Sequence, residues 1–360
     1  VYYGAVFGGS TSSILLNAPG VPGTVATSFD GYPMAQQGKA GKALAIAAWS
    51  SFAGGTLSAI YLLFMAPSLS KVSLSFRSPD YFALMILGLT AIAAFSSKGQ
   101  FLKAMMMVVL GLMLASVGQD SLSDITRFTF NNMNLTDGIS FVLVVMATFA
   151  MSEALTIILK RNDPTSAAKQ VSLTELGSIK INKEERTKMY KTIPRSSVIG
   201  FLIGVLPGAG ATIASFLAYG MERNVVSDEE KEKFGKGSVN GLSAPETANN
   251  AACSGSFVPM LTLGIPGSGT TAVMLGALLG FGVQPGPRLY MTNPEIFWSI
   301  IMSMYIGMVI LLILNLPLIP YIARILAVPK NYLIPLILFF SVTGIYVMSF
   351  NNFDIYLMIG

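Results

Sequence analysis

A proline–glycine interruption inside a long apolar segment constrains the fold of this chain more than any other feature. Residues 261–273 read Leu-Thr-Leu-Gly-Ile-Pro-Gly-Ser-Gly-Thr-Thr-Ala-Val, and the central Pro-Gly-Ser-Gly cannot continue a helix. Proline lacks a backbone N–H, and glycine leaves helical geometry at little cost. Inside a membrane, non-helical backbone is tolerated only where it is buried in protein or lines a cavity. Transporters build substrate sites from such broken helices.

Two other stretches have the same character. Residues 16–24 read Leu-Asn-Ala-Pro-Gly-Val-Pro-Gly-Thr and align with the stretch 261–273 at an offset of 247 positions. Residues 206–212 read Leu-Pro-Gly-Ala-Gly-Ala-Thr. We call these three stretches the first, second and third break in chain order, so that residues 261–273 form the third. A single break is typical of a packing kink between helices, but three breaks, two of them repeat-related, favour a binding site.

The composition predicts an all-α polytopic membrane protein. The 360 residues are 52% hydrophobic and 11% charged, whereas soluble domains carry about 25% charged residues. There is no histidine, and Cys253 is the single cysteine. These counts exclude a disulfide framework, a His- or Cys-based metal site and a Ser-His triad. We therefore expect no metal and no cofactor beyond a coupling ion.

Basic residues divide the chain into two related transmembrane halves. Residues 160–195 hold nine of the 23 Lys and Arg residues, so the positive-inside bias predicts a cytoplasmic linker. We expect a first half at 1–159 and a second half at 196–360. The segment 196–220 lies between basic stretches, which indicates a re-entrant hairpin broken at Pro207.

Several long apolar segments are expected to span the bilayer, whose hydrocarbon core needs about 20 residues of helix. They are 43–66, ended by Pro67, and then 138–159, 295–316 and 331–349. The chain starts and stops inside apolar runs, at Val1 and Gly360, and we expect it to be a fragment truncated at both ends.

Polar residues near the breaks are candidates for ligand contacts. We read residues 240–256 as a small, polar stretch before the third broken segment. Within it, the amides of Asn249 and Asn250 can bind a carboxylate or an ion without burying a charge. Glu246 follows Pro245 and either caps a helix start or binds a coupling cation. Asp30 follows the first break and either binds a coupling cation or caps the next segment.

These stretches carry a resemblance to a known family. Its first signature is similar to Tyr-Gly-Ala-Val-Phe-Gly-Gly-Ser at 3–10, Ser-Ile-Leu-Leu-Asn-Ala-Pro-Gly at 13–20 and Asp-Gly-Tyr-Pro-Met-Ala at 30–35. Its second signature is similar to residues 204–210, 234–237 and 244–252, and Leu-Gly-Ile-Pro-Gly-Ser-Gly at 263–269 completes it. The chain resembles the large membrane subunit of tripartite tricarboxylate transporters over essentially its whole length.

The resemblance implies a secondary transporter, driven by a cation gradient, in the bacterial inner membrane. It implies two partners, a periplasmic solute-binding protein that delivers the carboxylate and a small membrane subunit. We expect a di- or tricarboxylate substrate, with citrate as the first candidate, and Na⁺ or H⁺ as the coupling ion. Nothing in the sequence indicates nucleic-acid binding.

Neutral donors and helix ends are expected to hold the anion, because no Lys or Arg stands beside the breaks. The expected site residues are Asn17, Pro19, Gly20, Thr24, Pro207, Gly208, Gly210, Asn249, Asn250, Pro266, Gly267, Ser268, Gly269 and Thr270. Asp30 and Glu246 are the candidates for the coupling ion. The rival prediction is an ion channel whose Gly-rich breaks form a filter. An intramembrane enzyme is disfavoured, because the usual nucleophile–base and metal sets are missing.

Overall fold

The computed structural model groups the chain into two units, Val1–Ala91 with Ala168–Ala327 and Ile92–Ala167 with Val328–Gly360. The structure describes residues 2–73 except 18, 100–120, 125–140, 177–316 except 208 and 209, and 330–359. It also describes residues 75, 77, 79, 80, 82, 83, 86, 143, 144, 147, 155, 158, 159 and 318. All of the predicted site residues belong to the larger unit.

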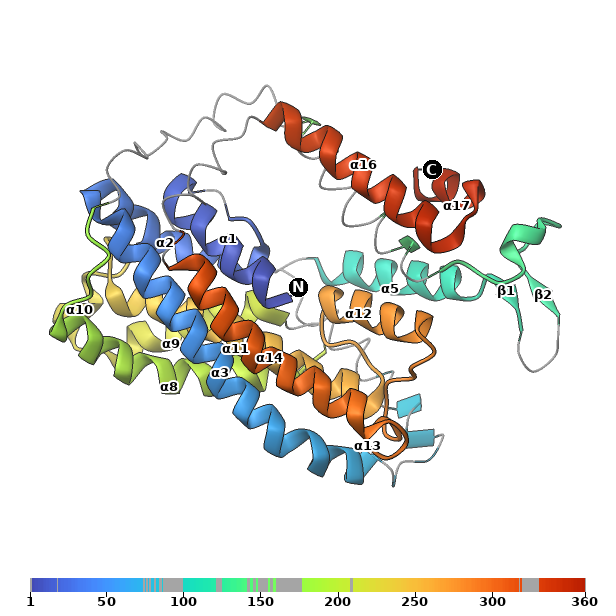
Figure 1. The fold of residues 1–360 in the computed structure, drawn as a ribbon, viewed down its shortest axis with the longest axis horizontal. Coiled ribbons are helices and arrows are strands. Elements are labelled where there is room, and N and C mark those ends of the chain that lie inside the picture. Colours follow the sequence, from blue (N-terminus) through green and yellow to red (C-terminus); the bar gives the residue numbers. More distant parts are fainter. Residues whose placement is uncertain are drawn as a thin grey trace. The chain divides into compact units, whose positions relative to one another are not determined.

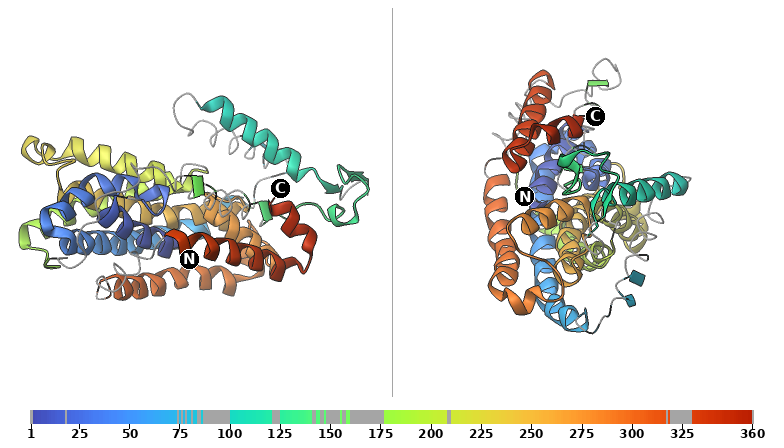
Figure 2. Two further views of the ribbon diagram at one scale, coloured as in Figure 1. Left: turned by 90° about the horizontal axis from the view of Figure 1, so that it is seen from above. Right: turned by 90° about the vertical axis from the view of Figure 1, so that its right-hand side faces the viewer.

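The described part of the chain is almost entirely helical, which confirms the all-α class (Figure 1). The larger unit contains α1 (Tyr2–Leu16), η1 (Pro22–Thr24), α2 (Val25–Met34), η2 (Ala35–Lys39), α3 (Ala40–Ser73), α8 (Lys183–Val205), α9 (Gly210–Val225), α10 (Asp228–Lys231), α11 (Val239–Leu263), α12 (Gly269–Gly280), α13 (Leu289–Thr292) and α14 (Pro294–Asn315). Helices α3, α11 and α14 run lengthwise through this unit (Figure 2).

Helix α11 is the centre of the larger unit. All of its residues between Asn240 and Thr262 are buried, and its small side chains let the neighbouring backbones approach closely. A Cβ atom added at Gly54 of α3 would lie 2.4 Å from the backbone oxygen of Thr247. A Cβ atom added at Gly200 of α8 would lie 2.3 Å from that of Ala248. Small residues at helix contacts are typical of membrane bundles.

The small, polar stretch 240–256 is helical throughout. It lies inside α11, with Pro245 and Pro259 both within the helix. An internal proline costs about 3 kcal/mol in an exposed helix. In α11, the packing of small residues against α3 and α8 offsets this cost, since backbone groups freed by proline in a buried helix find partners on neighbouring elements.

Helix α3 extends beyond its predicted end. The prediction that Pro67 stops the segment at Ala66 was wrong, because the helix continues through Pro67 to Ser73. Before α3, the chain passes through the π-helical turn η2, where Gly38 has a φ of 73°. The segment predicted at 295–316 corresponds to α14. The segment predicted at 138–159 lies largely outside the described residues.

Helices α8 and α9 form an antiparallel hairpin around the second break. An ion pair between a partly exposed arginine and a buried glutamate joins them far from the turn: Arg195 Nη2 of α8 donates to Glu222 Oε1 of α9 at 2.7 Å. Thr192 and Asn240 also donate to this oxygen, at 2.7 and 3.1 Å. The hairpin therefore begins earlier than expected, because α8 starts at Lys183, inside the predicted linker.

The smaller unit contains α5 (Phe101–Ala115), β1 (Gly118–Gln119), β2 (Thr126–Arg127), η3 (Met133–Leu135), α16 (Lys330–Ser349) and α17 (Asn352–Ile359). The two short strands pair antiparallel, with Gly118 opposite Arg127. Helix α16 matches the segment predicted at 331–349. Leu143, Ile345 and Met358 form a small apolar cluster in this unit.

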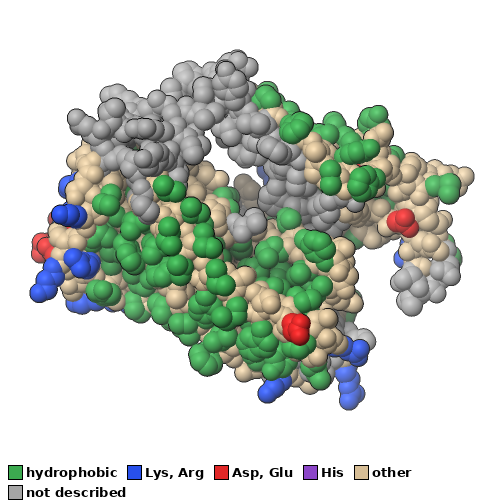
Figure 3. Space-filling model, in the orientation of Figure 1, with side chains coloured by type: hydrophobic (Ala, Val, Ile, Leu, Met, Phe, Trp, Pro, Cys, Tyr) green, Lys and Arg blue, Asp and Glu red, His purple; other side chains and the backbone are tan. Residues whose placement is uncertain are grey.

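Two helical stretches among the described residues are long and apolar enough to cross a membrane, Pro22–Leu69 and Pro294–Asn315. Helix α14 exposes a row of large apolar side chains that includes Met302, Ile306 and Ile310. Hydrophobic side chains cover much of the visible face of the larger unit, while Lys and Arg gather toward its ends (Figure 3). Such a band is typical of a surface in contact with lipid.

Candidate functional site

All three breaks interrupt helices in the structure. The first separates α1 from η1, the second separates α8 from α9, and the third separates α11 from α12. Gly208 of the second break lies outside the described residues. Pro19 and Gly20 are exposed, whereas Thr24 and Gly267 are buried. The remaining predicted break residues are partly or fully exposed: Asn17, Pro207, Gly210, Pro266, Ser268, Gly269 and Thr270.

The first and third breaks have the same local geometry at the offset of 247 positions. The residue after the helix is left-handed in both, Asn17 with φ 51° and Gly264 with φ 73°. Glycine is the residue most often found in this conformation at a helix end, and asparagine is the next choice. The helix resumes at Pro22 after the first break and at Gly269 after the third.

The contacts inside the two breaks also correspond. A Cβ atom at Gly20 would lie 2.8 Å from Gly9 Cα, and one at Gly267 would lie 2.8 Å from Ser256 Cβ, the equivalent position. In each break the chain therefore turns back along the helix that precedes it. The hydroxyl of Thr24 donates to the carbonyl of Val21 at 2.9 Å, just as Thr271 donates to Ser268 at 2.9 Å.

The first break contacts both the start of α9 and the middle of α11. A Cβ atom at Gly23 would lie 3.1 Å from Ala211 Cβ of α9. The backbone oxygen of Gly23 accepts a hydrogen bond from Asn249 Nδ2 of α11 at 3.2 Å. The third break contacts α11 about two turns further along, at Ser256. Among the described residues, these contacts bring the first break together with the start of α9 and with Asn249.

Glu246 is fully buried in α11, and each of its carboxylate oxygens accepts two hydrogen bonds. Ser10 of α1 and Ser51 of α3 donate to Oε2 at 2.6 and 2.7 Å. Thr27 of α2 and Asn249 Nδ2 donate to Oε1, the latter at 3.4 Å. All four donors are neutral, and no ion pair with Glu246 occurs within the described ranges. Helices from distant parts of the chain thus meet at one buried carboxylate.

The capping alternative for Glu246 was wrong. Helix α11 begins at Val239, and its N-cap is Ser238, whose hydroxyl accepts a hydrogen bond from the N–H of Gly241 at 3.1 Å. Glu246 therefore lies well inside the helix, where its charge does not interact with the free N–H groups of a helix start. Acidic side chains are almost never fully buried unless they are paired, so the buried Glu246, which faces only neutral donors, is a candidate functional residue.

Ser10 has a second acceptor within reach. Its hydroxyl donates to Glu246 Oε2 at 2.6 Å, and the carbonyl oxygen of Val6 lies 3.1 Å away. A hydroxyl group has one proton and two lone pairs, and it can rotate. Ser10 can donate a hydrogen bond to an ionised Glu246, or it can turn its proton to the Val6 carbonyl and accept a hydrogen bond from the O–H of a neutral Glu246. The carboxylate can change its protonation without leaving a polar group unpaired.

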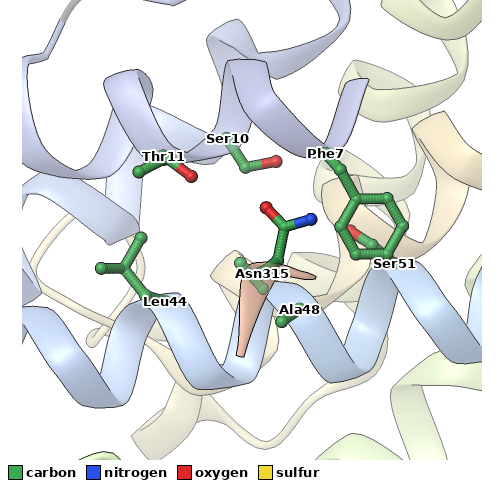
Figure 4. Close-up of a pocket in the computed structure, with 8 residues that line it drawn as sticks. Phe7, Ser10, Thr11, Leu44, Ala48, Ser51 and Asn315 are labelled. Carbon is green, nitrogen blue, oxygen red and sulfur yellow. The ribbon is translucent and has the colours of Figure 1, made fainter. Parts of the chain in front are cut away.

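A small cavity lies beside Ser10 and Ser51, the two donors to Oε2. It measures about 10 Å³, and Thr11 and Asn315 supply its other polar groups. The amide of Asn315 reaches from the end of α14 toward Ser10 and Thr11 (Figure 4). A polar cavity of this size has room for about one water molecule. The serines thus connect the buried carboxylate to a space that can hold water.

Asp30 is also fully buried, but its partners are different. Its Oδ1 accepts three backbone N–H groups, from Gly235, Gly237 and Ser238, at 2.9, 2.9 and 2.7 Å. Its Oδ2 accepts the hydroxyl of Tyr219 at 3.0 Å. Asp30 therefore holds α2 against the loop that leads into α11. The capping alternative for Asp30 was wrong, because Asp30 lies inside α2 and does not cap the segment that follows it. The coupling-ion prediction for Asp30 stays a prediction.

The two asparagines use their amide donors inside the protein. Asn249 Nδ2 donates to Gly23 and Glu246, and Asn250 Nδ2 donates to the Glu246 carbonyl at 3.0 Å and to Asn249 Oδ1 at 2.8 Å. The buried Oδ1 of Asn250 has no hydrogen-bond partner among the described residues. The free atom of this pair is thus an acceptor, which suits a cation or a donor group better than a carboxylate.

Sequence reasoning missed the serine and threonine partners of Glu246. Ser10, Thr27 and Ser51 are small polar residues within apolar helices, and this placement is a weak signal. Two more serines of α3 continue the polar contact with α11, since Ser50 shares a hydrogen bond with Ser243 at 2.7 Å and Ser58 shares one with Ser254 at 2.6 Å. The repeated serines of α3 could have indicated a buried polar seam.

The chain is similar to a transporter family along its whole length. The family described as "Tripartite tricarboxylate transporter TctA family" matches residues 1–360. An uncharacterised 52.8 kDa protein of the TAR-I ttuC' 3' region of Agrobacterium vitis is 41% identical over 359 residues, which is 100% of this chain and 70% of the relative. A second uncharacterised protein, of the TAR-II ttuC' 3' region in that organism, is 44% identical over 160 residues, covering 44% of this chain and 65% of the relative. No solved structure matches the chain.

Proposed function

Because this chain belongs to the tripartite tricarboxylate transporter TctA family, we propose that it imports a di- or tricarboxylate by secondary active transport, with Glu246 binding the coupling cation. Citrate is the first candidate substrate, and Na⁺ or H⁺ is the coupling ion. The partners in this proposal are a periplasmic solute-binding protein and a small membrane subunit. The protein would act in the bacterial inner membrane as a multi-pass permease.

The environment of Glu246 carries the proposal. A buried carboxylate without a cationic partner is costly to keep ionised, and here only neutral donors face it. It is therefore suited to bind a cation reversibly, whether the cation is a proton that joins the carboxylate or a sodium ion that takes over its lone pairs. All four donors are hydroxyl or amide groups, and three of them come from helices other than α11.

The carboxylate substrate belongs, in this proposal, at the breaks. Helices α9 and α12 start at the second and third breaks, and free N–H groups and the helix dipole favour an anion at such starts. Ser268 and Thr270 add hydroxyl groups at the third break. Asn17, Pro19, Gly20 and Thr24 would line the site from the first break. Asn249 connects both functions, because it touches Gly23 of the first break and Glu246.

Coupling follows from these shared contacts. A cation at Glu246 withdraws the carboxylate from some of its four donors. Asn249 and Thr27 are two of those donors, and Asn249 also holds the backbone of the first break. Occupancy of Glu246 would therefore change the first break, and through Gly23 it would change the start of α9. A ligand shifts an equilibrium only through such differential contacts between two states.

The test is uptake of radiolabelled citrate and other di- and tricarboxylates into proteoliposomes that hold the full-length tripartite system. We expect saturable uptake that requires the binding protein and rises with an inward Na⁺ gradient or an inward proton gradient. Thr270→Val should raise the half-saturation concentration several-fold, since one hydrogen bond is worth about 0.5–1.5 kcal/mol. The matched control, Thr292→Val, changes an exposed threonine whose hydroxyl donates to its own helix.

The rival function would give a different result. An ion channel would conduct without saturation at the substrate concentrations used, and it would need neither the binding protein nor a cation gradient. Uptake of that kind would overturn the proposal. Equal half-saturation values for Thr270→Val and Thr292→Val would leave transport standing but remove the third break from the substrate site.

A further inference from the structure

A groove of about 640 Å³ lies between α3 and α8 in the larger unit, away from Glu246 and the breaks. Its inner surface is apolar and includes Phe52 of α3 and Met189 and Ile193 of α8. Trp49 and Tyr190 stand along its walls and are 42% and 74% exposed. Its volume is within the range of about 300–1,000 Å³ that is typical of small-ligand sites.

Two cationic side chains lie at one end of the groove. Lys180 and Arg186 line it, both residues are exposed, and neither takes part in the ion pairs found among the described residues. Neighbouring basic residues behave differently, since Lys42 pairs with Glu185 at 2.9 Å and Lys188 pairs with Glu230 at 2.9 Å. Within the described part of the chain, no acidic side chain neutralises these two groove cations.

The groove has a polar end and an apolar length because α3 and α8 run in the same direction. Lys42 pairs with Glu185 near the start of both helices, and Tyr61 packs on Phe201 further along, with ring centroids 5.5 Å apart. Arg186 is close to the start of α8, and Met189 and Ile193 follow one and two turns later. We call the end of the unit where α3 and α8 begin the basic end, because Lys42, Lys180 and Arg186 lie there. The apolar surface of the groove extends from this end toward the middle of the unit.

We propose that this groove binds an anionic phospholipid, with the headgroup phosphate held by Lys180 and Arg186 and an acyl chain lying along Phe52, Met189 and Ile193. The groove has cationic side chains at one end and apolar side chains along its length, and the lipid has an anionic headgroup followed by an apolar chain. The basic end is the one that the positive-inside bias assigns to the cytoplasm. Trp and Tyr are enriched at the level of the headgroups, and basic pockets between membrane helices on that side hold anionic headgroups.

A lipid in this place would stabilise the contact between α3 and α8. Helices α3 and α8 also pack against α11. The lipid would therefore affect the packing around Glu246 without touching its carboxylate. A short polypeptide segment could also fill an apolar groove, but its presence would not explain why two cations lie at one end of it. The charge arrangement therefore favours the lipid.

The test compares phosphatidylglycerol with phosphatidylcholine as added lipids for the purified full-length protein in detergent. Melting temperature and native mass spectrometry report binding. We expect phosphatidylglycerol to bind more tightly and to raise the melting temperature. Lys180→Gln/Arg186→Gln should weaken phosphatidylglycerol binding at least about tenfold, because each basic residue near the headgroup adds to the attraction. The control Lys183→Gln/Lys191→Gln removes two exposed lysines that do not line the groove and should bind like the unchanged protein.

Three results would overturn the proposal. Equal binding of the two lipids would show that charge at this site has no role. Equal loss of binding in the groove variant and the control would show only a general attraction to basic surface. A photo-crosslinker placed at Tyr190 that captured another subunit of the transporter instead of lipid would identify the groove as a subunit interface.

Discussion

Asp30 and Glu246 are both fully buried, and each accepts four hydrogen bonds, yet their donors differ in kind. Three of the donors to Asp30 are backbone N–H groups, whereas those to Glu246 are side-chain hydroxyls and one amide. A backbone N–H has a fixed proton and no lone pair to offer. A hydroxyl group can rotate and become an acceptor. Asp30 must therefore stay an acceptor, while Glu246 can exchange a donor for a bound cation.

The comparison separates an anchor from a candidate coupling site, although both residues look alike in the sequence. Each is a lone acid near a Pro or Gly in an apolar part of the chain. The difference lies in what surrounds them in space. The Gly-rich loop before α11 offers its backbone to Asp30, and the helices α1, α2 and α3 offer hydroxyl groups to Glu246. A variant that removes the charge of Glu246 should therefore lose transport and keep its stability. A variant that removes the carboxylate of Asp30 should lose stability and keep transport per folded molecule.

The largest effect is expected for Glu246→Gln. Glutamine has the shape of glutamate, and the rotatable hydroxyl groups around it can adjust to its amide, so the fold should persist. Loss of a charged partner from a desolvated site costs about 3 kcal/mol, which corresponds to a loss on the order of 100-fold in gradient-driven uptake. The measurement is initial uptake of labelled citrate at equal protein in the membrane. Glu295→Gln, at an exposed acid in the first turn of α14, is the control, and equal uptake by the two variants would contradict a coupling role.

The next largest effect is expected at Asp30, which holds α2 against the loop before α11. Asp30→Ala leaves three backbone N–H groups without their acceptor, and each unsatisfied buried group costs about 1–3 kcal/mol. We expect a clearly lower melting temperature and less protein in the membrane. Asp30→Asn keeps one carbonyl oxygen for these donors and should recover most of the stability. Uptake per folded molecule should stay close to that of the unchanged protein in Asp30→Asn. If it falls as far as in Glu246→Gln, Asp30 takes part in coupling and the distinction between the two carboxylates fails.

The breaks and the outer helices could be predicted from the sequence because their signals are local. Proline and glycine interrupt a helix wherever they stand together, and the helices α14 and α16 are uniform apolar segments of the right length. The alignment of the two Pro-Gly pairs also indicated that the first and third breaks are related, and Asn17 and Gly264 share a left-handed φ at equivalent positions. These features depend on residues that are neighbours in the chain.

Helix α11 could not be predicted in the same way. Its Ser, Thr, Asn and Gly residues and its two prolines have low helix propensity, and they read as a polar loop. The helix forms because α3 and α8 bury it on two sides through close contacts at Gly54, Gly200 and Gly204. The partners of Glu246 were hidden for a related reason, since Ser10 and Ser51 are 236 and 195 positions away in the chain. No local pattern tells which serine meets which acid.

A smaller effect is expected when one hydroxyl donor to Glu246 is removed. Ser10→Ala and Ser51→Ala each take away one of the two donors to Oε2, and we expect the half-saturation for the coupling cation to change by about tenfold, or about 1.4 kcal/mol. Ser303→Ala is the control, because its hydroxyl donates within α14. Titration of uptake with Na⁺ and with pH gives the half-saturation. If both variants have the same half-saturation for the coupling cation as Ser303→Ala, the two serines only fill space around Glu246.

The smallest effect belongs to a third carboxylate, Glu230, which faces cations at the basic end of the unit. Burial raises the pKa of Glu230, but hydrogen bonds from Lys233 and Lys188 outweigh burial and lower the pKa below its usual value. A lowered pKa in the folded state means that Glu230 adds stability above its unfolded pKa, about 4.3, and that this gain disappears as the pH falls through the folded value. Glu230→Gln should therefore melt slightly lower than the unchanged protein at pH 7, and the gap should close below about pH 4. A gap that stays constant with pH would mean that the two lysines contact Glu230 without stabilising its charge. Because these pairs are partly exposed and screened by salt, the effect should shrink at high ionic strength, which is not expected for Asp30 or Glu246, whose neutral donors are buried with them.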